Sequence, residues 1–356
     1  MSEISAKITL DSITDGGSRL VTWELTYPRS IHAELMTYRV LSRNLASSRA
    51  ISLKKMRKRV AEGPFVPITW GADQKGMQAH EQVDDVAAAE RWWSRCWAQA
   101  IDNHATGEAL GLHKQIVNRV LEPYAYAIGV VTMTDHANLF HQRRHHAAEP
   151  HFQRLANLMW EAFHEHTPTY REPGEWHLPY VVDPDTNCVS DEDYDFAAEH
   201  MKFDGVGRRL VWTAGRHAVF NATTNRLTEG GVTVAVPGFK RSMSINDGAM
   251  AVLRKLSTAR CARVSYLNHD GKRDPVADVA LHDKLIAGAA TGDPLHASPF
   301  EHQAEAVGGR ERIKNFEGWR MYRCYLENEA GPSTEDRCDR CGCWGGRHVT
   351  HCTEAA

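Results

Sequence analysis

The chain has 356 residues, and its length, composition and charge limit what it can be. Hydrophobic residues make up 42% and charged residues 24% of the sequence, which is typical of a soluble globular protein with one large or two ordinary domains. The formal net charge of -3 argues against a strongly basic surface for nucleic acid. No apolar run reaches the roughly 18 residues of a membrane span, and the start of the chain lacks the pattern of a secretion signal, so we expect a cytoplasmic protein.

The first half of the chain predicts one strand followed by several helices. Residues 18–27 alternate apolar and polar side chains, which predicts a strand. Residues 31–40 have helical spacing, with Ser30 as the expected N-cap. The apolar run 128–132 is either a buried strand or the approach to a helix. Further helices are predicted over 84–105, 108–121, 134–146 and 148–166.

The pattern changes at about residue 168. Residues 168–249 combine loop-like, acidic and short strand patterns, which predict a β-rich insertion or linker module without assignable chemistry. Helical patterns return at 247–261 and 276–290. We therefore expect an α+β protein in four parts: 1–167, 168–249, 250–330 and 331–356.

Two polar segments, more than two hundred residues apart, stand out. The first is TYRVLSRNLASSR at 37–49, and the second is ARVSY at 262–266 followed by HASPFEH at 296–302. In the first segment arginines and small hydroxyl or amide side chains occur without acidic neighbours. Arginine forks beside hydroxyl groups suit a phosphate. The alternative is a helix end with exposed arginines, and composition alone does not decide between the two.

These segments resemble signatures of the flavin-dependent thymidylate synthases, the ThyX family. TYR-x7-S resembles the RHR-x7-S signature, and ARVSY with SPFEH resembles the flavin-contacting segments of the family. In the family those segments precede the arginine signature, whereas here they follow it. The order is that of a circular permutation or a long fused variant, similar to long ThyX-like proteins of actinobacterial phages. The resemblance implies a mixed α/β fold with a helical scaffold and a twisted sheet.

The resemblance also implies a binding site for the phosphate of dUMP. Residues 113–123 resemble the R-x-x-L-P region of the family, and residues 131–143 resemble its N-x-R-S-x-x-N-F-x-x-x-R stretch. The structural alternative is that the arginines of these two segments are ordinary exposed helix residues. The implied substrate-binding residues are Arg39, Ser47, Ser48, Arg49, Arg119 and Arg143.

The arginine signature departs from the family at three positions. Thr37 stands at the first arginine, Tyr38 at the histidine and Leu45 at a glutamate. These changes remove a phosphate fork and a base-orienting carboxylate. They motivate an alternative product, in which a flavin-dependent enzyme hydroxymethylates dUMP or another pyrimidine deoxynucleotide for viral DNA modification.

The resemblance implies a flavin-binding part of the site, formed by both late segments and by the helix predicted at 134–146. In the family reduced FAD supplies the hydride, methylenetetrahydrofolate supplies the carbon and NADPH is the reductant, so no cysteine nucleophile is needed. The family forms homotetramers with sites shared between subunits, which implies an oligomer here. The implied flavin-contacting residues are Asn138, Ser265, His296, Ser298 and Glu301.

The C-terminal tail carries a cluster of soft metal ligands. A C-x2-C pair followed by H-x3-C offers a tetrahedral zinc site, formed by Cys338, Cys341, His348 and Cys352. The alternative is a tail without metal. A hypothesis from another class uses this tail and the arginine segments for non-catalytic binding of nucleic acid, and the negative net charge argues against it.

Overall fold

The computed structural model describes residues 3–79, 81–186, 188–199, 245–267, 273–290 and 297–326. Between these ranges it also describes the backbone of five short strands, listed below with their sheet. The described residues form helices together with mainly antiparallel sheets, which confirms the predicted α+β class. None of the described helices combines the length and the apolar character needed to cross a membrane.

A five-stranded sheet with the order β3-β4-β2-β1-β5 lies at the centre of the first half. Its long strands pair antiparallel, and only β5 runs parallel to its neighbour β1. The strand predicted at 18–27 is confirmed as β2, and the run 128–132 is a strand within β4. The strands are β1 (Ser5–Ile13), β2 (Arg19–Pro28), β3 (Ser42–Leu45), β4 (Tyr126–Met133) and β5 (Thr169–Tyr170).

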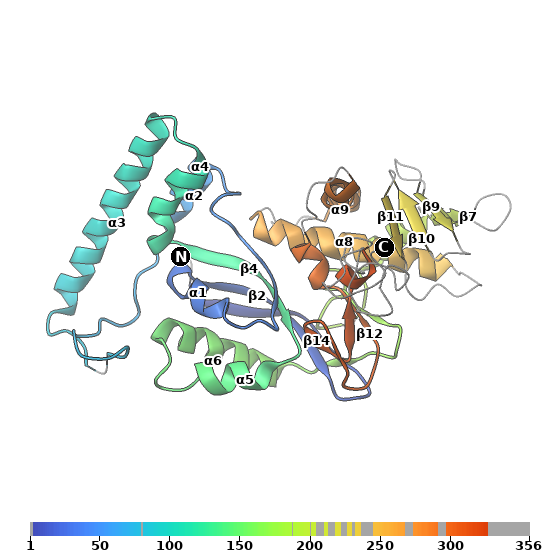
Figure 1. Cartoon of the computed structure of the whole chain (residues 1–356), viewed down its shortest axis with the longest axis horizontal. Coiled ribbons are helices and arrows are strands. Elements are labelled where there is room, and N and C mark those ends of the chain that lie inside the picture. Colours follow the sequence, from blue (N-terminus) through green and yellow to red (C-terminus); the bar gives the residue numbers. More distant parts are fainter. Residues whose placement is uncertain are drawn as a thin grey trace, which may run out of the picture.

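Each face of this sheet is covered by helices because the strands alternate their side chains. Trp23 and Val131 point to the face covered by α5 (His136–Arg143) and α6 (Pro150–Glu165), which lie together below the sheet in Figure 1. Phe152, at the start of α6, is fully buried in this core. Val130 points to the opposite face, where it packs against α8 (Ile245–Ser265).

The helices beside β3 correct two predictions. The helix predicted at 31–40 is reduced to η1 (Arg29–Ile31) and α1 (His32–Leu35), and Ser30 caps neither, because the chain turns back to pair β3 with β4. The predicted helix 108–121 is wrong. α3 (Val86–Ala109) ends before Gly111, whose φ is +73°, and the chain continues as α4 (Lys114–Val117) and η2 (Asn118–Tyr124).

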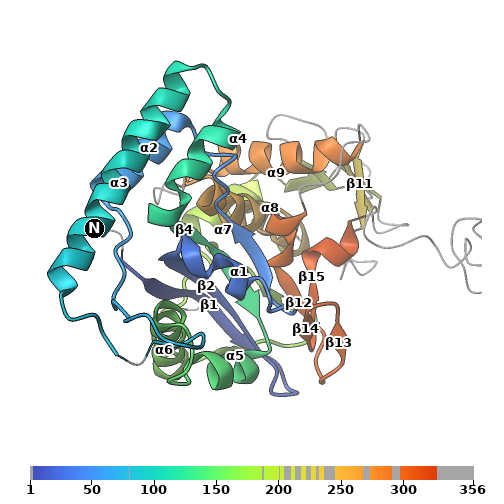
Figure 2. The same ribbon diagram turned by 60° about the vertical axis from the view of Figure 1, so that its left-hand side comes forward.

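Figure 2 shows α3 and α4 beside α2 (Leu53–Glu62) at the edge of the molecule next to β4. η2 packs against both α2 and α3. This group of helices forms a small core of its own around residues such as Leu121 and Val60. The loop between β3 and α2, which carries the end of the arginine signature, therefore lies on η2.

The last third of the described chain returns to the central sheet. A three-stranded sheet joins β15 (Trp319–Met321), β12 (Ala304–Ala306) and β6 (Trp176–His177). β5 and β6, at the start of the predicted insertion 168–249, therefore pair with strands of 1–167 and 250–330. A second five-stranded sheet is formed by β7 (Met201–Phe203), β8 (Leu210–Trp212), β9 (Ala218–Asn221), β10 (Arg226–Glu229) and β11 (Val232–Ala235). A two-stranded sheet pairs β13 (Arg312–Ile313) with β14 (Phe316–Glu317). The remaining helices are α7 (Asp191–Glu199), α9 (Pro275–Ala290), η3 (Ser298–Glu301) and η4 (Tyr322–Tyr325).

Candidate functional site

The two distant polar segments meet at the side chain of Asn44. Asn44 lies on β3 and is buried, with 3% of its surface exposed. Its Nδ2 donates a hydrogen bond of 3.0 Å to the carbonyl oxygen of Cys261 on α8, 217 positions away. Its Oδ1 accepts a hydrogen bond of 3.1 Å from the hydroxyl of Ser298 on η3, 254 positions away. One amide thus joins the arginine signature to the residue directly before ARVSY and to the SPFEH segment.

Gly129 on β4 permits this approach of β3. Asn44 pairs with Val130 and Leu45 pairs with Gly129 in the antiparallel register. A Cβ added at Gly129 would lie 2.5 Å from the carbonyl oxygen of Asn44 and 2.4 Å from Cδ2 of Leu45. Real Cβ contacts are not that short, so a side chain at this position would displace the strand that carries Asn44.

The predicted flavin residues of the late segments lie around this joint. Ser265 is buried near the end of α8, and its hydroxyl donates to the carbonyl oxygen of Ala262 at 2.7 Å. Glu301 is half-buried on η3 and forms an ion pair with Arg323 of η4. η3 packs against both β3 and α8, so Ser265, Ser298 and Glu301 belong to one region of the molecule.

The end of the arginine signature forms a loop on η2. Arg39 and Arg49 are exposed, and Ser47 is half-buried with its hydroxyl oxygen accepting from the backbone N–H of Arg49 at 3.3 Å. Ser48 is buried, and its hydroxyl donates to Oε1 of Glu122 on η2 at 2.5 Å. The two adjacent serines therefore have different environments.

Glu122 pairs with Arg119, which is a predicted substrate-binding residue, and with Arg29, which is not. Arg119 approaches both of its carboxylate oxygens at 3.4 Å, and Arg29 lies 3.5 Å from Oε1. Burial lowers the pKa of the nearby His32, and the charge of Arg29 lowers it further, whereas Glu122 raises it. Glu122 thus balances part of the positive charge that the arginines bring to this face.

A separate cluster joins the signature to α5. Arg143 donates to the hydroxyl of Tyr38 at 3.0 Å and to Oε2 of Glu34 at 2.7 Å. The same hydroxyl of Tyr38 donates to Gln142, whose side-chain nitrogen donates to Oδ1 of the exposed Asn138 at 3.0 Å. Tyr38, which stands at the family's histidine, therefore links Asn138 and Arg143 to the signature segment.

A buried chain of hydrogen bonds runs between the central sheet and the small three-stranded sheet. His302, directly after η3, contacts Thr132 through Nδ1 at 2.8 Å. Thr132 contacts Thr22 at 2.7 Å, Thr22 contacts His177 at 2.8 Å, and His177 contacts Ser12 at 2.9 Å. All five side chains are fully buried. Burial lowers the pKa of His302 to about 3, so its ring is neutral at physiological pH.

A buried arginine fixes α8 between its neighbours. Arg260 is 1% exposed, its two terminal nitrogens each lie 2.5 Å from an oxygen of Asp193 on α7, and its Nε donates to Asp278 on α9 at 3.0 Å. Arg263 of the ARVSY segment donates to the other oxygen of Asp278 at 2.7 Å. The sequence patterns did not reveal this network, because its two acids lie in segments without a motif.

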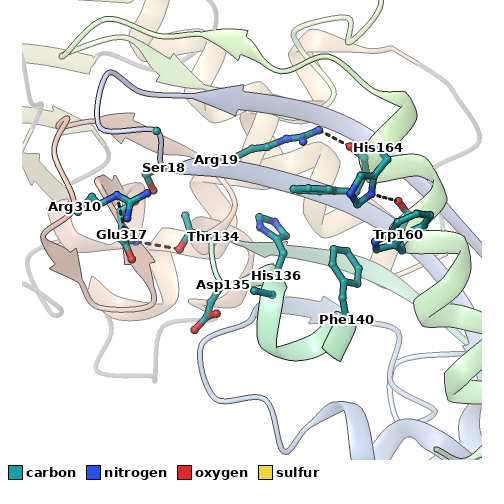
Figure 3. Close-up of a pocket in the computed structure, with 13 residues that line it drawn as sticks. Ser18, Arg19, Thr134, Asp135, His136, Phe140, Trp160, His164, Arg310 and Glu317 are labelled. Carbon is teal, nitrogen blue, oxygen red and sulfur yellow. Dashed lines mark hydrogen bonds and ion pairs between the residues drawn. The ribbon is translucent and has the colours of Figure 1, made fainter. Parts of the chain in front are cut away.

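A pocket of about 460 Å³ opens at the end of β4, and none of the predicted site residues lines it. Figure 3 shows His136 and Phe140 of α5 on one side of it, with Arg19 opposite and Trp160 and His164 of α6 at one end. Burial, followed by the charge of Arg19, lowers the pKa of His136 to about 3. The arginine of the family's N-x-R-S stretch corresponds to Thr134, which lines this pocket.

Several predicted residues lie outside the described part of the chain. These are His296 of the flavin set and the whole predicted zinc set, Cys338, Cys341, His348 and Cys352. Within the described residues, no group of three or more His, Cys, Asp or Glu side chains is placed to hold a metal ion.

Comparisons with known proteins give partial structural likenesses. No family model and no curated protein matches the chain. The chain is similar to the UMP/dUMP methylase PolB from Streptomyces cacaoi, solved with 5-bromo-UMP, with 18% identity over 46% of this chain and 90% of that one and a TM-score of 0.37. It is also similar to ThyX from Helicobacter pylori, solved with FAD and dUMP, with 17% identity over 40% of this chain and 67% of that one and a TM-score of 0.31. At these identities and TM-scores neither likeness assigns an activity to the chain.

Three residues that hold the candidate site together are absent from the predicted binding residues: Asn44 at the joint, and Asn118 and Glu122 on η2. Asn44 follows the family's asparagine in the signature, which was the available signal. Glu122 occupies the leucine position of the R-x-x-L-P region. This replacement of leucine by an acid is the one sequence feature that could have indicated its hydrogen bond to Ser48. Asn118 carries no sequence signal at all.

Proposed function

We propose that the chain is an FAD-dependent enzyme that converts dUMP to dTMP by reductive methylation, with methylenetetrahydrofolate as carbon donor. The observation that carries this proposal is the joint at Asn44. In the permuted order of motifs, the arginine signature and the flavin segments form one site only if residues 217 and 254 positions apart meet. The side chain of Asn44 contacts Ser298 of the SPFEH segment and the backbone of Cys261, the residue directly before ARVSY.

The substrate phosphate is assigned to the loop on η2 and its neighbours. Arg49 and Arg119 are exposed cations there, Arg39 is an exposed cation in the turn before β3, and a guanidinium matches a phosphate with two parallel hydrogen bonds. Ser47 supplies a hydroxyl group in the same loop, whereas the hydroxyl proton of Ser48 is donated to Glu122. Arg143 is assigned to the nucleotide on the α5 side, where it is held by Tyr38 and Glu34.

The hydroxyl oxygens at the joint fit a flavin, because they can accept hydrogen bonds from it. Ser265 and Ser298 donate their hydroxyl protons to Ala262 and Asn44, so each presents oxygen lone pairs that accept hydrogen bonds. Hydroxyl and N–H groups of a flavin are suitable donors to them, and His296 and Glu301 are assigned to the same cofactor. Asn138 was predicted for this cofactor too, but it lies in the separate cluster on α5, which covers the opposite face of the central sheet from α8. Bound FAD would supply the hydride, with NADPH as reductant, and the chain's own residues would orient the nucleotide and exclude water.

The chain uses no cysteine nucleophile in this proposal. Cys261 is buried beside the joint, and burial raises the pKa of its thiol well above the usual range. A thiol that stays protonated at physiological pH does not attack a pyrimidine ring. The cysteine that lies beside the joint is therefore not suited to act as a nucleophile there.

The visible absorbance spectrum of the purified protein, before and after addition of dUMP, tests the proposal. We expect the visible absorbance bands of a flavin, and we expect them to shift when dUMP binds beside the ring. The Asn44→Leu variant is the matched comparison, since it removes both hydrogen bonds of the joint at similar volume. Wild-type protein that is colourless and takes up no FAD would contradict the proposal.

Hydroxymethylation of a pyrimidine deoxynucleotide is the second candidate reaction. It is favoured by Thr37, Tyr38 and Leu45, and by the hydroxyl of Tyr38, which is engaged by Gln142 and Arg143 where the family has a histidine. Incubation with dUMP, methylenetetrahydrofolate and NADPH, followed by mass spectrometry, separates the two products. Formation of dTMP alone rejects hydroxymethylation, and salt-dependent binding of DNA without turnover would favour the non-catalytic alternative.

Two further parts of the proposal concern assembly and the tail. A homotetramer with shared sites would bring a second copy against the exposed arginines, and light scattering after gel filtration measures its mass. Zinc held by Cys338, Cys341, His348 and Cys352 would appear as one metal ion per chain by elemental analysis. The Cys338→Ser variant should lose that zinc.

A further inference from the structure

Asn118, on η2, holds the loop that carries Arg49. Asn118 is fully buried. Its Nδ2 donates to the carbonyl oxygens of Ser48 at 2.8 Å and of Ile51 at 2.9 Å, which lie on either side of Arg49. A single amide group therefore fixes the backbone before and after this arginine.

His104 of α3 fixes the orientation of Asn118. Its Nε2 lies 3.0 Å from Oδ1 of Asn118, and both residues are fully buried. Because both amide protons of Asn118 go to carbonyl oxygens, Oδ1 must accept, and His104 must carry its proton on Nε2. Nδ1 of His104 has no hydrogen-bond partner among the described residues, so Asn118 is the group that the ring contacts through a hydrogen bond there.

Glu122 adds a third point of attachment between η2 and the same loop. It accepts the hydroxyl proton of Ser48, so this proton is not free to bind an anion. Ser47 differs, because no described residue accepts its hydroxyl proton. The loop therefore presents the hydroxyl of Ser47 and the guanidinium of Arg49 as donors, and both are held in place from η2.

We propose that Asn118, oriented by His104, is a positioning residue that preorganises this loop for the phosphate of the nucleotide. The proposal rests on the proposed function, since it assumes that Arg49 and Ser47 bind a phosphate. A loop that is already ordered loses less conformational freedom when the anion binds, so its affinity is higher. Asn118 itself does not touch the ligand.

The Asn118→Asp variant tests the proposal with little change in volume. A carboxylate cannot donate to two carbonyl oxygens, so both bonds that bracket Arg49 are weakened. The matched control is Asn157→Asp, because Oδ1 of Asn157 accepts from Arg144 and the change preserves that bond. His104→Gln, whose amide can donate in place of Nε2, is a second variant that should stay close to wild type, whereas His104→Phe should resemble Asn118→Asp.

Two measurements are made on the full chain: calorimetric dissociation constants for dUMP and for deoxyuridine, and amide hydrogen exchange of residues 46–52. We expect Asn118→Asp to bind dUMP at least about tenfold more weakly, because the loop must then be ordered when the phosphate binds. The affinity for deoxyuridine, which has no phosphate, should not change. Exchange in the loop should accelerate. Unchanged dUMP affinity together with unchanged exchange would overturn the proposal.

The exchange measurement separates this inference from the proposed function. If wild-type protein does not bind dUMP while Asn118→Asp still accelerates exchange in the loop, the proposed function fails and the role of Asn118 in ordering the loop stands. If wild-type protein binds dUMP and Asn118→Asp binds both ligands equally weakly, Asn118 supports the fold in general and the positioning role is rejected.

Discussion

Ser298 donates its hydroxyl proton to Oδ1 of Asn44 across 254 positions of sequence. The other end of the same amide donates to the backbone of α8. The segments that meet here come from opposite ends of the described chain. The same two hydrogen bonds that hold the fold together at this point therefore also hold the proposed cofactor site together.

Asn44→Ala should destabilise the fold by about 2–3 kcal/mol, because it leaves a buried carbonyl oxygen and a half-buried hydroxyl without their partner. Ser298→Ala should cost about 1 kcal/mol, and the double variant should show a coupling of about 0.5–1.5 kcal/mol. Urea unfolding measures the free energy of unfolding of the wild type, of both single variants and of the double variant. The exposed Asn138→Ala is the control and should stay within about 0.5 kcal/mol of wild type.

Gly129→Ala should destabilise β3 and reduce flavin retention. The added methyl group would lie 2.5 Å from the carbonyl oxygen of Asn44, so the strand must move by more than the usual tolerance. We expect a loss of about 1–3 kcal/mol by urea unfolding. Combining the change with Leu45→Ala should restore only part of the loss, because the contact with the backbone oxygen remains. Complete restoration would contradict this account.

Arg260→Met should be among the most damaging single changes in the described chain. It leaves Asp193 without its fully buried partner, and removal of one member of a buried ion pair typically costs about 3–5 kcal/mol. Thermal unfolding followed by circular dichroism is the measurement. Arg91→Met is the matched control, because Arg91 forms an exposed pair with Asp85 and such pairs contribute about 0–1 kcal/mol. Equal effects of the two changes would refute the assignment.

Acid should destabilise the protein through its buried histidines. Burial lowers the pKa of His136 and of His302 to about 3, from an ordinary value of 6.5. Between these values the unfolded chain binds protons that the folded chain does not, so the stabilising contribution is complete above pH 6.5 and is lost as the pH falls toward 3. Each histidine should contribute about 1.4 kcal/mol per pH unit to the slope of the unfolding free energy.

The control compares the removal of a buried histidine with the removal of an exposed one. His302→Gln should make the dependence of the urea midpoint shallower between pH 6 and pH 4.5. The exposed His145→Gln serves as comparison. A slope that is the same in His302→Gln and wild type would show that the ring of His302 takes up its proton in both states.

The regular elements with strong periodicity could be predicted from the sequence, because their side chains alternate or repeat over many residues. Residues 18–27 and 148–166 show such patterns, and the structure has β2 and α6 there. The helix predicted at 108–121 failed because Gly111 ends α3 and Pro123 lies inside η2, so local conformational limits overrode a helical spacing.

The candidate site could be predicted only where motifs carry it. Arg39, Ser47 and Ser298 were found from their spacing in recognisable segments, and their roles remain proposals. Asn118 and Glu122 were not found, because their partners lie 70 and 74 positions away and depend on how η2 packs. Hydrogen bonds of that kind are properties of tertiary structure, and no local pattern encodes them.

The buried chain of hydrogen bonds from Ser12 to His302 has a consequence for synthesis of the protein. Thr22 and Thr132 are on strands that leave the ribosome early, whereas His302 emerges only after more than four-fifths of the chain has been made. Until then one face of the central sheet keeps polar groups that lack their final partner. Completion of this layer is therefore a late step, and nascent chains stalled before residue 302 should expose that face to chaperones.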